Sequence, residues 1–176
     1  ALLKFSKEKI STLKEIYRWP MNLSQLPVKL EIEAKDVYAQ HIELRFKLHE
    51  HYLKAQHSQE HYALVKWYIY HWGGVRGNHQ STLVLYTSSL PEQLIQRGAR
   101  GIASWSKALS VIDPQQYAIY DARVAIALNA LQIIYAVQQP IYYPLLSSQN
   151  KTIQACTLSM RPIVKTWDKM PKNGFY

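Results

Sequence analysis

The chain has 176 residues, enough for one domain with a substantial hydrophobic core. Hydrophobic residues make up 48% and charged residues 19% of the chain, which is typical of a globular protein and excludes a disordered one. The single cysteine excludes an internal disulfide and any four-cysteine zinc or iron–sulfur site. The net charge of +9 favours a polyanionic partner, with nucleic acid ahead of a membrane surface.

The chain has no stretch near the roughly 18 uninterrupted apolar residues of a membrane span. It also lacks a charged segment followed by an apolar run, so no signal peptide is expected. We therefore predict a cytoplasmic or nucleoid-associated protein that does not bind membranes, and the lone cysteine suits such a reducing compartment.

Apolar residues recur at helical spacing along the first half of the chain. Residues 2–20 predict a basic amphipathic helix that Pro20 ends. Residues 33–56 predict the longest helix, with His41 in its apolar stripe. Residues 60–72 predict another helix, although their many aromatic side chains also suit a strand.

The second half predicts helices separated by glycine- and proline-containing turns. The segment QSTLVLYTS is ambiguous between helix and strand. Further helices are predicted over 90–98, 102–112 and 121–137. In the last of these, the residues expected on the buried face are Val124, Leu128, Leu131 and Tyr135.

From residue 140 to 176, prolines and polar residues alternate with short apolar runs, which predicts an irregular tail. The sequence thus predicts a mainly α fold with a single domain over residues 1–176. Its core would be a helix–hairpin–helix motif at about residues 90–137.

The predicted hairpin has the sequence LIQRGARGIASWSKAL, and its turn is at residues 98–101, with Gly98 and Gly101 at its ends. Glycines let the backbone bend sharply and let a phosphate approach main-chain N–H groups. The N-terminus of the next helix adds partial positive charge, and Arg97 and Arg100 add full charges. This pattern predicts a sequence-independent grip on double-stranded DNA, with Arg123 as a further phosphate contact. The alternative is an ordinary helix end followed by a turn.

Residues 90–131 resemble the helix–hairpin–helix DNA glycosylase superfamily, which includes 8-oxoguanine, adenine and alkyl-base glycosylases. In that family a glycine-rich hairpin opens a helix, a loop follows, and a catalytic aspartate begins the next helix; Asp121 occupies that place here. The family's nucleophilic lysine would fall near Ile102, and Lys107 lies about a turn and a half further along. The resemblance therefore implies a monofunctional N-glycosylase, a hydrolase that removes a damaged or modified base in DNA repair. Neither a metal nor a cofactor is expected.

Asp121 has two interpretations. Its carboxylate would stabilise the oxocarbenium-like sugar of base excision, or orient the attacking water. Alternatively, it is only a helix N-cap, a role that contributes about 1 kcal/mol without any chemistry. In that case the chain is a non-catalytic module that binds DNA or a protein partner. The two roles are compatible.

A flipped base needs a pocket with stacking faces. The aromatic residues that we predict to line it are Trp67, Tyr70, Trp72 and Trp105. The alternative for each of them is packing in the core. The second glycine cluster, WGGVRGN at residues 72–78, has no P-loop ending. It is interpreted either as a phosphate-contacting loop or as a plain loop between packed helices.

Overall fold

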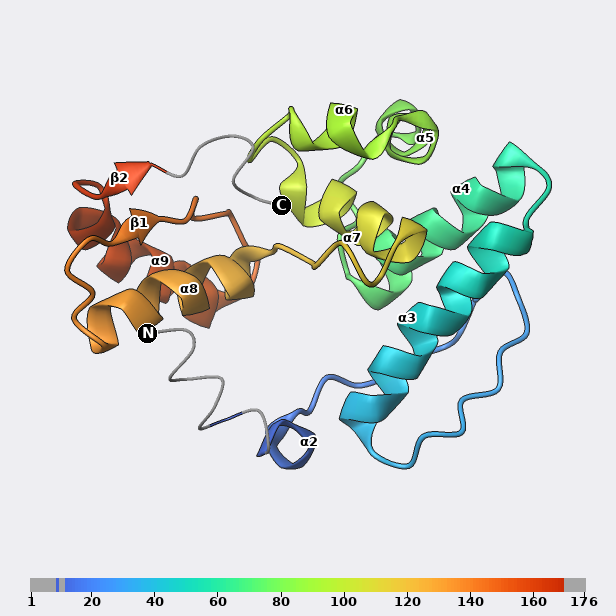
Figure 1. Ribbon diagram of the computed structural model, residues 1–176, viewed down its shortest axis with the longest axis horizontal. Helices are drawn as coiled ribbons and strands as arrows, with labels where there is room; N and C mark the ends of the chain where they lie inside the picture. Colours follow the sequence, from blue (N-terminus) through green and yellow to red (C-terminus); the bar gives the residue numbers. More distant parts are fainter. Residues whose placement is uncertain (1–8, 10–11, 170–176) are drawn as a thin grey trace. The chain divides into compact units, whose positions relative to one another are not determined.

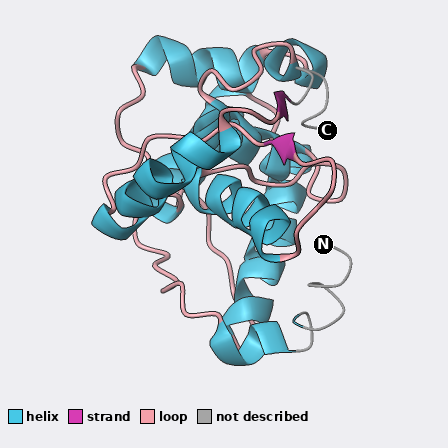
Figure 2. Ribbon diagram, turned by 90° about the vertical axis from the view of Figure 1, so that its left-hand side faces the viewer, coloured by secondary structure: helices cyan, strands magenta, loops and turns pink. Residues whose placement is uncertain are grey.

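The computed structural model describes residue 9 and residues 12–169. Figure 2 shows that these residues are mainly helical with little strand, which confirms the predicted mainly α fold. The chain forms two compact units. Unit 1 comprises Ala1–Ser11, Ile95–Ala103 and Tyr120–Tyr176, and unit 2 comprises Thr12–Leu94 and Ser104–Ile119. The single domain stays a prediction, and each unit is described by itself below.

Unit 2 is built from helices that pack around one apolar core. Its elements are α2 (Leu13–Ile16), α3 (Val37–Lys54), α4 (Ser58–Trp67), the π-helix η2 (Tyr68–Trp72), α5 (Gln80–Ser88), most of α6 (Pro91–Ile95) and most of α7 (Ile102–Ile112) (Figure 1). Residues 60–72 are therefore helical and not a strand, and the ambiguous segment QSTLVLYTS is helix α5. Of the helix predicted over 2–20, the described part contains α2, residues 17–20 are not helical, and 2–8, 10 and 11 lie outside the described residues.

The long helix α3 shows how local sequence sets an element of unit 2. It starts later than predicted because Asp36 is its N-cap, with the side chain accepting a hydrogen bond from Ala39 N at 2.9 Å. Glu43 on this helix accepts hydrogen bonds from Lys47 and from the N–H groups of Glu33 and Ala34, so it fastens the preceding connector. The ion pair with Lys47, followed by those two N–H groups, lowers the pKa of Glu43 to about 2.

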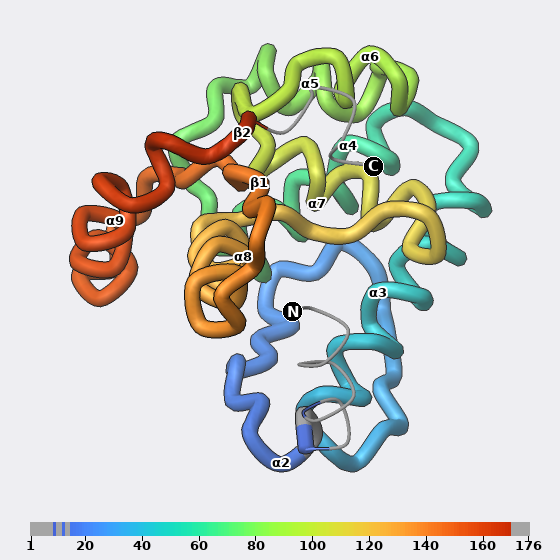
Figure 3. The backbone as a smooth tube through the Cα atoms, turned by 60° about the vertical axis from the view of Figure 1, so that its left-hand side comes forward, coloured from blue at the N-terminus to red at the C-terminus, as the bar shows by residue number. Residues whose placement is uncertain are grey.

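Unit 1 pairs two helices with a short sheet. Helix α8 (Ala122–Ile134) packs on α9 (Lys151–Val164), as Figure 3 shows. The strands β1 (Ile141–Tyr142) and β2 (Asp168–Lys169) are parallel, with Ile141 opposite Asp168. The prediction of an irregular tail over 140–176 is wrong for the residues of α9, because fourteen of them form this helix. Asn150 caps that helix through Ile153 N at 3.1 Å, and Pro162 lies in its last turn.

Two buried amides on α8 hold the segment that follows it. Asn129 Nδ2 donates to Tyr143 O at 2.7 Å, and its Oδ1 accepts from Tyr143 N at 3.1 Å. Gln132 makes the same pair of bonds with Ile141, at 2.9 and 2.8 Å. The predicted stripe of Val124, Leu128, Leu131 and Tyr135 is therefore mostly wrong, because Ala125, Asn129, Leu131 and Gln132 are the buried residues. Both side-chain amides can be buried at little cost, because their hydrogen bonds satisfy backbone groups of β1 and of Tyr143, the next residue.

Candidate nucleic-acid interface

The glycine turn, residues 96–101, joins the end of α6 at Ile95 to the start of α7 at Ile102. Gly98 has φ = 56° and Gly101 has φ = 74°, a left-handed conformation that favours glycine at both positions. Gly98 N donates to Ile95 O at 2.9 Å and closes the end of α6. Gly101 then directs the chain into the first turn of α7. Both glycines are thus required by the backbone.

The tip of the glycine turn is open to solvent. Ala99, Arg100 and Gly101 are exposed, Arg97 is half-buried and Gly98 is buried. Within the residues that the structure describes, the N–H groups of Ala99 and Gly101 have no hydrogen-bond acceptor. Exposed amides directly before a helix are the donors that an anion uses at a helix N-terminus. The turn therefore has the local chemistry of a phosphate contact.

Asp121 is the N-cap of α8, as one of its two interpretations required. Its Oδ1 accepts hydrogen bonds from Arg123 N at 2.9 Å and Val124 N at 3.1 Å. Its Oδ2 lies 3.7 Å from Nη1 of Arg123, and the side chain is 23% exposed. The cap therefore uses one carboxylate oxygen, while the second lies beside a guanidinium at the surface. Asp121 and the glycine turn belong to the same unit, and the catalytic role of Asp121 stays a prediction.

Arg123 was predicted to contact phosphates. Its side chain is 53% exposed and lies against Asp121, so its first role in the structure is an ion pair within α8. Because this pair is exposed and 3.7 Å long, it contributes little to stability.

The four aromatic residues predicted to line a pocket all lie in unit 2. Trp67 and Trp105 are core residues with 2% and 0% exposure, and Trp67 Nε1 donates to Ser24 O at 2.9 Å. Tyr70 is half-buried and donates its hydroxyl hydrogen to Asn78 O. Four surface cavities of about 320 to 540 Å³ are lined by other residues. Packing in the core, the alternative interpretation, therefore accounts for the positions of Trp67 and Trp105 in the structure.

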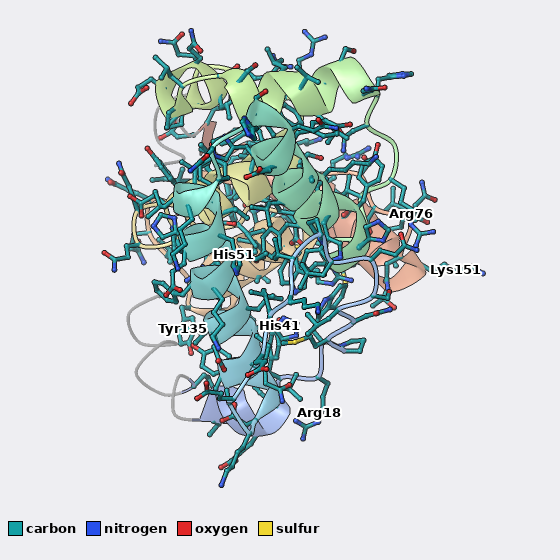
Figure 4. All side chains as sticks on the ribbon, turned by 90° about the vertical axis from the view of Figure 1, so that its right-hand side faces the viewer. Arg18, His41, His51, Arg76, Tyr135 and Lys151 are labelled. Carbon is teal, nitrogen blue, oxygen red and sulfur yellow. The ribbon has the colours of Figure 1, made fainter. Side chains whose placement is uncertain are left out.

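Trp72 takes part in an arrangement that the sequence did not reveal. Its ring stacks on Tyr68, with 4.3 Å between centroids and 11° between planes, and its Nε1 donates to His41 Nδ1 at 2.8 Å. Since Nδ1 of His41 accepts, Nε2 carries the hydrogen and donates to Trp19 O at 3.0 Å. Figure 4 labels His41 on α3. Burial lowers the pKa of His41, and the bond to Trp19 O opposes that shift.

The second glycine cluster is a loop packed within unit 2. A Cβ on Gly73 would lie 2.6 Å from Cε of Lys107, so glycine is needed for close approach to this buried lysine. Gly74 has φ = 67°, and Asn78 Nδ2 donates to Ser104 Oγ at 2.9 Å. These anchors favour the interpretation of a packed loop. Arg76, labelled in Figure 4, is exposed on it.

The net charge is divided very unevenly between the two units. The ranges of unit 1 contain 11 Lys and Arg against 3 Asp and Glu, whereas those of unit 2 contain 10 against 9. Unit 1 thus carries +8 and unit 2 carries +1, which add up to the +9 of the chain. The excess positive charge therefore lies in the unit that holds the glycine turn and Asp121.

Among residue 9 and residues 12–169, none of the helices has both the length and the hydrophobicity of a membrane span. In the same part of the chain, no group of three or more His, Cys, Asp or Glu side chains is placed to hold a metal ion.

Comparison of the chain with protein-family models, with curated proteins and with solved structures gave no match.

Proposed function

We propose that unit 1 binds double-stranded DNA through the glycine turn, as a distant relative of the helix–hairpin–helix DNA glycosylases. The observation that carries the proposal is the exposed turn with two left-handed glycines, directly before α7, in the unit with a charge of +8. Main-chain amides of Ala99 and Gly101 would donate to phosphate oxygens, and Arg97 and Arg100 would supply full charges. Such contacts depend on the sugar–phosphate backbone and not on base sequence.

The proposal extends to monofunctional N-glycosylase activity with Asp121 as the key carboxylate. The cap bonds hold Oδ1 and so fix the orientation of the side chain, while Oδ2 makes no cap bond and lies 3.7 Å from Nη1 of Arg123. An ionised oxygen held in this way would stabilise the positive charge that develops on a deoxyribose as its base leaves. It would also orient the water that attacks the sugar.

DNA binding is tested with a duplex titrated at several salt concentrations. The test variant is Arg97→Ala/Arg100→Ala, and the matched control is Arg18→Ala/Lys54→Ala, which removes two exposed charges from unit 2. Each lost phosphate contact lowers the slope of log affinity against log salt by about 0.9, so we expect the slope to fall by up to about 1.8 in the test variant. Absence of duplex affinity at low salt, or equal slopes in the two variants, overturns the proposal.

Catalysis is tested with a panel of damaged and modified duplexes, scored for abasic sites. Asp121→Asn keeps an oxygen that can accept the two cap bonds, so it is expected to retain stability and DNA affinity and to lose base release. Asp121→Ala also removes the cap and is expected to cost about 1 kcal/mol of stability.

The second candidate function is a non-catalytic module that binds DNA or a protein partner. The cap geometry of Asp121 favours it, since two N–H bonds already account for an aspartate at this position. It predicts that no duplex of the panel yields abasic sites with the wild-type chain, and that Asp121→Asn changes nothing.

A further inference from the structure

Helix α9 presents a cationic face in unit 1. Its fourteen residues include no Asp or Glu. Lys151 and Arg161 on the helix and Lys165 at its C-cap are all exposed. At 100° per residue, these three positions fall within about a quarter turn of one another. The buried residues of the helix, which are Thr157, Met160 and Val164, lie on an adjacent side, centred about 110° from the cations.

These three cations have no internal partner among the described residues. In the described ranges, the side chains of Lys151, Arg161 and Lys165 make no hydrogen bond or ion pair. On α3, in contrast, Lys47 lies 2.8 Å from Glu43. Figure 4 shows Lys151 extending from the end of its helix into solvent. The charge on this face is therefore available to an external anion.

A groove of about 320 Å³ runs beside the cationic face, between residues 146–148 and α9. Arg161 lines it together with Ser147 and Ser148. Ser148 Oγ accepts a hydrogen bond from Asn150 N at 3.2 Å, so its own hydrogen remains to be donated. Leu158, which is 65% exposed, supplies an apolar wall next to Arg161. A guanidinium with hydroxyl donors and an apolar wall suits a phosphodiester and its sugar.

We infer that this α9 surface, formed by Lys151, Arg161, Lys165 and the groove beside them, is a second contact for the phosphate backbone of nucleic acid. The inference rests on the proposed function, because it assigns a further surface of unit 1 to the same partner. Unit 1 has nine Lys and Arg besides Arg97 and Arg100 of the glycine turn, and this surface accounts for three of them. The cations hold the strand electrostatically, and the groove seats one phosphate.

The test compares Lys151→Ala/Arg161→Ala/Lys165→Ala with Lys29→Ala/Lys35→Ala/Lys66→Ala, which removes the same charge from exposed positions of unit 2. Duplex affinity is measured from 50 to about 300 mM salt, a range in which phosphate contacts dominate the salt dependence. We expect the α9 variant to lower the salt slope by about 2 to 3 and the affinity by at least about tenfold, at about 0.9 per contact. The unit 2 variant is expected to change the slope by less than about 1.

A second pair of variants tests the cationic face of α9 while keeping all of its Lys and Arg side chains. Leu158→Glu places a carboxylate among the cations, and Ile134→Glu places one on α8 at a site that is 72% exposed. Both sites are exposed, so both variants are expected to fold, which circular dichroism checks. Leu158→Glu is expected to weaken duplex binding several-fold more than Ile134→Glu.

The outcomes separate the two proposals. If the α9 variants bind like their controls while Arg97→Ala/Arg100→Ala lowers the slope, the inference is overturned and the proposed function stands. If only the α9 variants lower the slope, the α9 surface is supported and the glycine turn is not the DNA contact. A wild-type chain that does not bind duplex at low salt overturns both.

Discussion

Asn129 is the side chain of unit 1 whose loss we expect to cost the most stability. It is fully buried and makes three hydrogen bonds, to Ala125 O at 2.8 Å and to both backbone groups of Tyr143. Each such bond contributes about 1 kcal/mol net, and a buried group left without a partner costs about 1 to 3 kcal/mol. Asn129→Ala removes all three bonds and leaves the N–H and C=O groups of Tyr143 without these partners. We therefore expect the free energy of unfolding to fall by about 3 to 4 kcal/mol.

The assay is urea unfolding followed by circular dichroism. With a slope of about 2 kcal/mol per molar urea, the midpoint is expected to fall by about 1.5 to 2 M. Asn22→Ala is the control, because Asn22 is exposed and bonds only to the nearby Ser24 N, and we expect about 0.5 kcal/mol or less. If Asn129→Ala costs no more than Asn22→Ala, the Asn129 amide does not hold Tyr143, the residue after β1, against α8.

Two other predictions concern unit 2. Burial lowers the pKa of His41 below its usual 6.5, so below about pH 6.5 the unfolded chain binds more protons than the folded chain. The stability that the neutral imidazole contributes is therefore complete above about pH 6.5 and is lost as the pH falls below that value. Unfolding free energies measured between pH 5 and 8 should therefore rise with pH, and the rise should flatten in His41→Gln; an unchanged rise in that variant contradicts the assignment. Gly73→Ala should cost about 1 to 3 kcal/mol, because its Cβ would meet Lys107 Cε at 2.6 Å and Ile69 O at 2.9 Å. Gly77→Ala, whose Cβ meets nothing within 4 Å, should be neutral or slightly stabilising in the same thermal melt, and equal losses in the two variants would refute the packing argument.

Short sequence signals were enough to predict where the helices around the candidate site begin and end. Helix α7 has the predicted bounds because Gly101 precedes it and Asp113–Pro114 follows it. The start of α8 was equally predictable, since aspartate is a strong N-cap. In both cases the residues that set the boundary lie within a few positions of it.

Features that depend on distant partners were not predictable in this way. Asn129 and Gln132 read as polar surface positions, yet they are buried because backbone groups 9 to 14 residues later satisfy them. Trp67 and Trp72 look alike in sequence, but one fills the core and the other pairs with a histidine 31 residues away. Helix α9 was missed because Pro162 and a polar composition hid its buried face.

The uneven charge of the two units affects how fast the chain meets a polyanion as well as how tightly it holds one. At physiological ionic strength an electric field fades over about 8 Å, so only a dense group of charges guides a diffusing partner. Unit 1 carries +8 and unit 2 carries +1, so unit 1 should attract a polyanion more strongly. Encounter should therefore begin at unit 1, and the association rate constant should drop steeply as salt is added.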